Sequence, residues 1–169
     1  TLHNNYHMDS SFRIGRSTYV HVIILFVLFP TFLGCSNHSP ISNKKTYEVK
    51  INEKTSHAEV AFTQKGRTIG LMFRDKLDND HGMLFIYPQE KSLSFWMKNT
   101  KIPLSIAFIN SEEIITQIDS MTPYSLMSHT SKENVKYALE MEQGWFKKNG
   151  IRVGSKVGLS PEIMSLKIE

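Results

Sequence analysis

Residues 94–109, SFWMKNTKIPLSIAFI, bring side chains that could bind a ligand between two apolar, strand-like segments. Alternation along a strand puts Trp96 and Lys98 on one face and Met97 on the other. An aromatic ring beside a cation could bind a sugar, an acidic group or a peptide. The pattern predicts strand, tight connection and strand, with one face in the core and Trp96, Lys98 and Asn99 available to a ligand.

The sequence shows no recognisable catalytic motif. Hydrolysis needs a nucleophile beside a base, two carboxylates that face a bond, or a metal that activates water. Ser105 is a candidate nucleophile, but no base stands near it in the sequence. The histidines after residue 35 lack His-x-His or His-x-x-x-His spacing: His38, His57, His81 and His129. We predict no metal site and no cofactor, and we leave open whether the protein is an enzyme.

Residues 1–34 are predicted to be a lipoprotein-type signal peptide. Arg13 and Arg16 precede the apolar run 20–28, which is followed by FPTFLGC ending at Cys35. An apolar run of about ten residues is too short for the ~20 residues that span a bilayer. The segment resembles a bacterial lipobox, although Phe32 stands where Leu is usual. A free buried thiol and an uncleaved apolar segment remain alternatives.

Cleavage before Cys35 leaves 169 − 34 = 135 residues, which is the size of one domain. Cys35 is the only cysteine, so lipidation at this position leaves no internal disulfide. Residues 35–45 are predicted to be the lipidated cysteine and a polar tether, and residues 46–169 a single β-rich domain. Ser36 resembles an outer-membrane sorting signal, which predicts a lipoprotein of the outer membrane that faces the periplasm.

The charge of the predicted mature chain is mildly basic, because 18 Lys and Arg minus 15 Asp and Glu gives +3 after removal of Asp9, Arg13 and Arg16. These charges are dispersed and do not form a basic run with interleaved aromatic residues. We therefore predict no nucleic-acid partner. The predicted partners are the membrane, through Cys35, and an envelope glycan, peptide or protein.

Short strands dominate the rest of the chain. Phe62, Gly66, Ile69 and Phe73 recur at helical spacing, and Thr63 could cap a helix over 63–73. Residues 120–134 read as a long loop, and 144–150 as a helical turn. Alternating segments predict strands at 46–51, 57–62, 82–87, 112–119, 135–141, 155–159 and 165–169, besides the pair within 94–109. The fold class is mainly β: one β-sandwich, jelly-roll-like domain or barrel with one or two short helices packed on it.

Four segments together resemble the domain of unknown function 192 family. They are GLMFR at 70–74, GMLF at 82–85, FWMKNTKIPLSIAFI at 95–109, and YALEMEQGWFKKNGIRVGSKV at 137–157. The resemblance extends over about residues 47–159. It implies a single β-rich domain, commonly exported, and it implies no established activity.

The resemblance also implies which polar residues belong to a site. The predicted ligand-binding residues are Arg74, Trp96, Lys98, Asn99, Ser105 and Glu140. Among them, Ser105 stands where the family usually has Asp. The opposing interpretation is structural. In that case Trp96 packs under the 120–134 loop, while Lys98 and Arg74 form ordinary ion pairs with Glu140 or Asp119.

Three functions remain open from the sequence. The favoured one is a binding module that uses Trp96, Lys98 and Asn99, and the alternative is a hydrolase-like envelope enzyme whose site is assembled only by the fold. A lesser alternative is a soft metal such as Cu(I), held by thioethers of Met72, Met83 and Met97. Methionine also commonly fills irregular cores. A deep pocket that holds a strongly perturbed acid would favour the enzyme, and a shallow groove with paired charges would favour binding.

Overall fold

The structure is a computed structural model that describes residues 45–169. The predicted signal peptide and Cys35 lie outside the described residues. The elements are β1 Tyr47–Ile51, β2 Lys54–Ala61, α1 Gln64–Ile69, β3 His81–Lys91, β4 Ser94–Phe95, β5 Leu104–Ile109, β6 Ile115–Met121, β7 His129–Thr130, β8 Val135–Glu142, α2 Trp145–Lys148, β9 Val157–Leu159 and α3 Pro161–Met164. Within the described range, no helix is long and apolar enough to cross a membrane.

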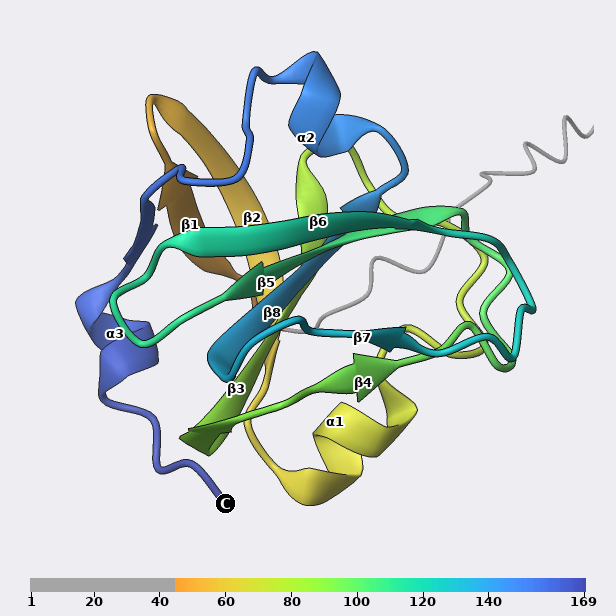
Figure 1. The fold of residues 1–169 in the computed structure, drawn as a ribbon, viewed down its shortest axis with the longest axis horizontal. Coiled ribbons are helices and arrows are strands. Elements are labelled where there is room, and N and C mark those ends of the chain that lie inside the picture. The colour runs from red at the N-terminus through yellow and green to blue at the C-terminus, as the bar shows by residue number, and fades with distance from the viewer. Residues whose placement is uncertain (1–44) are drawn as a thin grey trace, which may run out of the picture. The chain divides into compact units, whose positions relative to one another are not determined.

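Seven strands form one curled sheet in the order β6-β5-β8-β3-β2-β1-β9 (Figure 1). Strands β2 and β3 run parallel, because α1 and the loop after it connect them, and the other neighbours are antiparallel. The short strands β4 and β7 pair with each other in a separate two-stranded sheet. The predicted mainly-β class is confirmed.

The central strands β3, β5 and β8 are buried because both faces of the sheet are covered. All six residues of β5 are buried. Successive side chains point to opposite faces, so Ala107 belongs to a core with α2 and α3, whereas Ile106 and Phe108 belong to a second core. The second core also holds Leu93 and Met97, which flank β4. Figure 1 shows α1 on the side of β4 and β7, away from α2.

The hairpin predicted within 94–109 is wrong. Strand β4 contains two residues and pairs with β7, whereas β5 pairs with β6 and β8. The segment between β4 and β5 hydrogen-bonds instead to the loop between β6 and β7. The Met97 amide donates to the Ser125 carbonyl at 3.0 Å, and the Thr100 carbonyl accepts from the Tyr124 amide at 3.0 Å. Asn99 turns the chain with a left-handed φ of 55°.

The boundaries of other predicted elements also change. Thr63 caps α1 as predicted, because its hydroxyl accepts from the Gly66 amide at 3.0 Å. The helix ends at Ile69 rather than at residue 73, because Gly70 adopts a left-handed φ of 52°.

Two further segments differ from the prediction. Strand β3 continues through Pro88 to Lys91, with an irregular register beyond Ile86. Residues 165–169 form no strand, and the preceding segment forms α3 instead. The Ser160 hydroxyl, which accepts from the Ile163 amide at 3.4 Å, caps this helix.

Candidate functional site

A pocket of about 220 Å³ lies where the end of α1, strand β3 and strand β4 meet. Its walls combine aromatic and aliphatic side chains with a few polar groups. This volume is below the ~300–1,000 Å³ typical of sites for drug-sized ligands, so the pocket fits a small molecule or one group of a larger one. The lining residues are Arg67, Thr68, Ile69, Gly70, Leu71, Met72, Phe85, Tyr87, Ser94, Phe95, Trp96, Thr100 and Glu140.

Glu140 is the acidic residue of this pocket. It lies on β8 between Met83 of β3 and Ile106 of β5, which are its cross-strand partners and members of the second core. Glu140 is only 5% exposed. Burial raises the pKa of its carboxyl group to about 8. Within residues 45–169 no group donates a hydrogen bond to the Glu140 carboxyl group or forms an ion pair with it. A carboxyl group buried in this way stays neutral near pH 7.

Gly82 brings β3 unusually close to β8 beside Glu140. A Cβ atom at this position would lie 2.2 Å from the Glu140 carbonyl oxygen and 2.4 Å from the Met141 sulfur. Both distances are far below van der Waals contact, and one of the atoms belongs to the backbone. The glycine of GMLF therefore allows the strand pairing that positions Glu140.

Trp96 lines the pocket from the segment that follows β4. Its side chain is 47% exposed, whereas neighbouring Met97 is fully buried, so the predicted alternation of these two residues is observed. The Lys98 ammonium lies 5.1 Å from the centre of the Trp96 ring, which is a cation–π distance. Lys98 does not itself line the pocket. The ring is thus available to a ligand on the pocket side.

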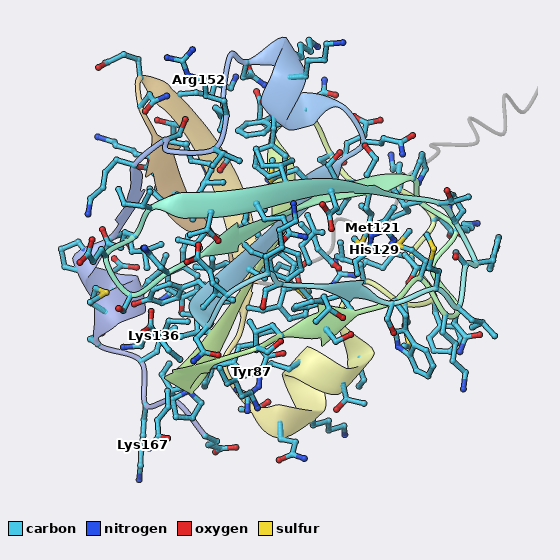
Figure 2. All side chains as sticks on the ribbon, in the orientation of Figure 1. Tyr87, Met121, His129, Lys136, Arg152 and Lys167 are labelled. Atoms are coloured by element: carbon cyan, nitrogen blue, oxygen red, sulfur yellow. The ribbon has the colours of Figure 1, made fainter. Side chains whose placement is uncertain are left out.

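Tyr87 and Arg67 form a wall that the sequence did not indicate. Tyr87 lies beside α1 (Figure 2), and the Arg67 guanidinium carbon is 4.8 Å from the centre of its ring. Arg67 also donates to the Phe62 carbonyl at 2.8 Å and to the Ile86 carbonyl at 3.0 Å. The pKa of Tyr87 is raised overall, mainly by desolvation. The charge of Arg67 opposes this shift, and that of Glu140 adds to it. Neither residue lies within the motifs that carried the resemblance.

The other predicted site residues lie elsewhere. Arg74 forms a two-pronged ion pair with Glu59, with Nη2 donating to Oε2 at 2.8 Å and Nη1 donating to Oε1. The Ser105 hydroxyl is buried and accepts from the Gly144 amide at 3.1 Å. The Asn99 carbonyl accepts from the Phe73 amide at 2.9 Å. Of the six predicted ligand-binding residues, the pocket brings together Trp96 and Glu140.

Asp119 and His129 form a second polar pair, away from the pocket. His129 Nδ1 lies 3.7 Å from an Asp119 carboxylate oxygen. In the part of the chain that the structure describes, the buried Nε2 atom of His129 has no hydrogen-bond partner. The Gln117 amide group donates to the same Asp119 oxygen at 2.7 Å and to the Thr130 carbonyl at 3.3 Å, which joins β6 to β7. This network therefore supports the small sheet that carries Phe95.

The residues described contain no group of three or more His, Cys, Asp or Glu side chains that could hold a metal ion. Met83 and Met97 are buried in the second core, and half-buried Met72 lines the pocket. The positions of Met83 and Met97 are those expected of core-filling methionines. Soft-metal binding stays a lesser alternative.

Known proteins resemble the chain in both sequence and fold. The sequence pattern of the DUF192 family, described as "Uncharacterized ACR", matches residues 47–159. A comparison with curated proteins finds no match.

Two crystal structures share this fold. One is of a protein from Sinorhizobium meliloti 1021, described as a "putative transcription regulator", with a TM-score of 0.66 and 31% identity over 69% of this chain and 95% of that one. The other is of a protein of unknown function from Novosphingobium aromaticivorans DSM 12444, with a TM-score of 0.65 and 29% identity over 70% and 89% of the two chains.

Proposed function

We propose that this chain, which belongs to the DUF192 family, is a binding module whose pocket beside Trp96 and Glu140 takes a small ligand. The observation that supports this function best is the buried carboxyl group of Glu140. It faces a pocket, and no described residue donates a hydrogen bond to it.

Desolvation of a carboxyl group costs free energy, and at Glu140 this cost appears as the raised pKa. In the described part of the chain, the buried side-chain atom without a hydrogen-bond partner is His129 Nε2, so the Glu140 carboxyl group is not sealed in the core but meets the pocket. An apolar residue between Met83 and Ile106 would avoid this cost. A ligand that hydrogen-bonds to Glu140 explains why an acid occupies this position.

The aromatic residues around the acid support a binding role. Phe85 and Phe95 pack edge to face with their ring centres 4.9 Å apart, and both line the pocket with Trp96. Aromatic walls with a small number of polar groups are typical of small-molecule sites, where the walls supply affinity and the polar groups fix orientation. Here Glu140, Thr100 and Ser94 are the orienting groups.

A hydrolase-like enzyme is the second candidate, and one specific observation favours it, although the described residues that line the pocket include no His, Cys or second carboxylate that would complete a catalytic group with Glu140. A carboxyl pKa of about 8 lies close to neutral pH, where a general acid or base works best. Such an enzyme would use Glu140 to transfer a proton and a pocket hydroxyl group or water to attack. The two functions differ in outcome, because an enzyme converts its ligand and a binding module returns it unchanged.

The proposed setting is the bacterial envelope, and it rests on the sequence. In this proposal Cys35 carries acyl chains such as palmitate, and residues 36–45 tether the domain to the outer membrane on the periplasmic side. The ligand would then be part of an envelope glycan, peptide or protein. Growth of a producing bacterium with an alkyne-tagged fatty acid should label the wild-type protein and leave a Cys35→Ala variant unlabelled. Equal labelling, or no labelling of either protein, would contradict the lipid anchor.

Ligand-observed NMR with a library of small organic fragments tests the binding function. The full-length wild type should bind a subset of fragments that neither Trp96→Ala nor Glu140→Leu binds, and each fragment should be recovered intact. Phe73→Ala is a matched control, because Phe73 is 75% exposed but does not line the pocket. Fragment binding that persists in both pocket variants would overturn the proposal, and chemical conversion of a fragment would favour the enzyme.

A further inference from the structure

A second hollow of about 220 Å³ adjoins the pocket at Tyr87. Gln64, Arg67, Thr68, Tyr87 and Lys91 line this hollow, which we call the Lys91 hollow. Arg67, Thr68 and Tyr87 also line the pocket of Glu140, so the two spaces share one wall. A ligand that occupied both spaces would cross this shared wall at Tyr87.

The Lys91 hollow is positively charged. The Lys91 ammonium lies 4.9 Å from the centre of the Tyr87 ring, and Arg67 lies over the same ring. Among residues 45–169, no Asp or Glu side chain forms an ion pair with Lys91 or Arg67. Three backbone oxygens hold the Arg67 guanidinium, those of Phe62, Ile86 and Glu169. Arg67 is thereby fixed in place, and Lys91 is exposed and free to meet a ligand.

We propose that the ligand is a small organic carboxylate that places its anionic group between Lys91 and Arg67 and its uncharged part beside Glu140 and Trp96. This inference rests on the proposed binding function and adds the chemical class of the ligand. Planar guanidinium and ammonium donors are the usual partners of carboxylates in proteins. The apolar pocket between Phe85, Phe95 and Trp96 takes the body of the molecule.

A cationic ligand fits this arrangement less well. If it occupied both hollows, its positive charge would lie near the two cations stacked on Tyr87. The buried Glu140 carboxyl is neutral at pH 7, so it offers such a ligand no compensating charge. In its neutral form Glu140 can donate its O–H to an ether, carbonyl or hydroxyl oxygen on the uncharged part of the ligand.

Three probes with the same aromatic ring test the charge assignment: phenylacetate, phenylacetamide and phenethylamine. Each is titrated into the full-length chain at pH 7 and low salt, with binding followed by NMR. We expect phenylacetate to bind roughly fivefold more tightly than phenylacetamide, which is the scale of one partly exposed charge pair. Phenethylamine should bind most weakly. Added NaCl should weaken phenylacetate binding and leave phenylacetamide binding unchanged, because salt screens the exposed Lys91.

Lys91→Gln removes the free cation, and Lys147→Gln removes an exposed lysine on α2 that lies outside both hollows. We expect Lys91→Gln to weaken phenylacetate roughly fivefold without changing phenylacetamide, and Lys147→Gln to change neither. Tighter binding of the amide or the amine would contradict the carboxylate class and leave the binding function standing. Failure of all three probes to bind would overturn the proposed function itself, and this inference with it.

Discussion

Glu140 and Trp96 line the same pocket from different parts of the fold, with Glu140 buried in the central strand β8 and Trp96 half-exposed after β4. The acid is therefore held by paired neighbours on both sides, Met83 and Ile106, while the ring lies in the segment that follows the two-residue strand β4. A ligand that touches both side chains would join a fixed polar anchor to a less constrained aromatic one.

The first prediction concerns the pH dependence of stability. The pKa of Glu140 is about 8 in the folded protein and 4.5 in the reference state. Between these values the unfolded chain releases a proton that the folded protein keeps, so the free energy of unfolding falls as pH rises from 4.5 to 8. At 1.36 kcal/mol per pKa unit, the loss is at most ~5 kcal/mol.

Glu140→Gln cannot ionise and should not show this loss. We expect urea unfolding to give a difference in stability, variant minus wild type, that grows in favour of the variant from pH 5 to pH 8. Because other titrating groups are the same in both proteins, they cancel in this difference. An equal difference at the two pH values would mean that the carboxyl group is already ionised in the folded protein at pH 5.

The second prediction compares two neighbours in sequence. Trp96→Ala should change the free energy of unfolding by less than about 1 kcal/mol, because half of the ring is exposed. Met97→Ala should cost ~2–5 kcal/mol, because Met97 is fully buried in the second core. Urea unfolding of both variants measures the contrast, and fluorescence can follow it through the remaining Trp145. Similar losses for both variants would place Trp96 in the core.

The third prediction concerns the close approach of β3 and β8. Gly82→Ala should destabilise the domain by more than ~3 kcal/mol or prevent folding, because its Cβ would overlap the Glu140 carbonyl oxygen. Gly158→Ala is the matched control, since its Cβ would lie 3.7 Å from the Lys50 Cβ and 3.8 Å from the Lys50 carbonyl oxygen. Circular dichroism and thermal unfolding of both variants test this. A stable Gly82→Ala protein would show that the two strands can separate without cost.

The fourth prediction assigns Arg74 to structure. The side chains of Arg74 and Glu59 are 17% and 15% exposed and form a two-pronged ion pair. Arg74→Met should lower the free energy of unfolding by roughly 1–3 kcal/mol, because Glu59 then loses a charged partner. Fragment binding in the pocket should not change, since Arg74 is not a lining residue. If Arg74→Met lost fragment binding while its stability was unchanged, Arg74 would be a ligand-binding residue and this prediction would be wrong.

Local patterns in the sequence predicted local structure well. The alternation that separates Trp96 from Met97 depends only on the geometry of an extended chain, and the structure keeps it although β4 is two residues long. Thr63 likewise caps α1 because a hydroxyl group at that position reaches the Gly66 amide within one turn.

Long-range pairing was not predictable in the same way. Residues 104–109 alternate as a strand whichever neighbour they pair with, so the pattern could not show that β5 lies between β6 and β8. For the same reason the sequence could not show that Arg67, Tyr87 and Glu140 line one pocket. They come from α1, β3 and β8, and only the fold brings them together.

The most direct test of the central claim is the free energy of unfolding of Glu140→Leu relative to wild type at pH 7.5. If Glu140 is kept for a ligand, no protein group depends on it, and an apolar side chain should suit the second core better. We expect the variant to be more stable by at least ~1 kcal/mol, while the fragments that bind the wild type no longer bind. A variant that is less stable than wild type would show that Glu140 supports the fold, and would contradict its role as a ligand anchor.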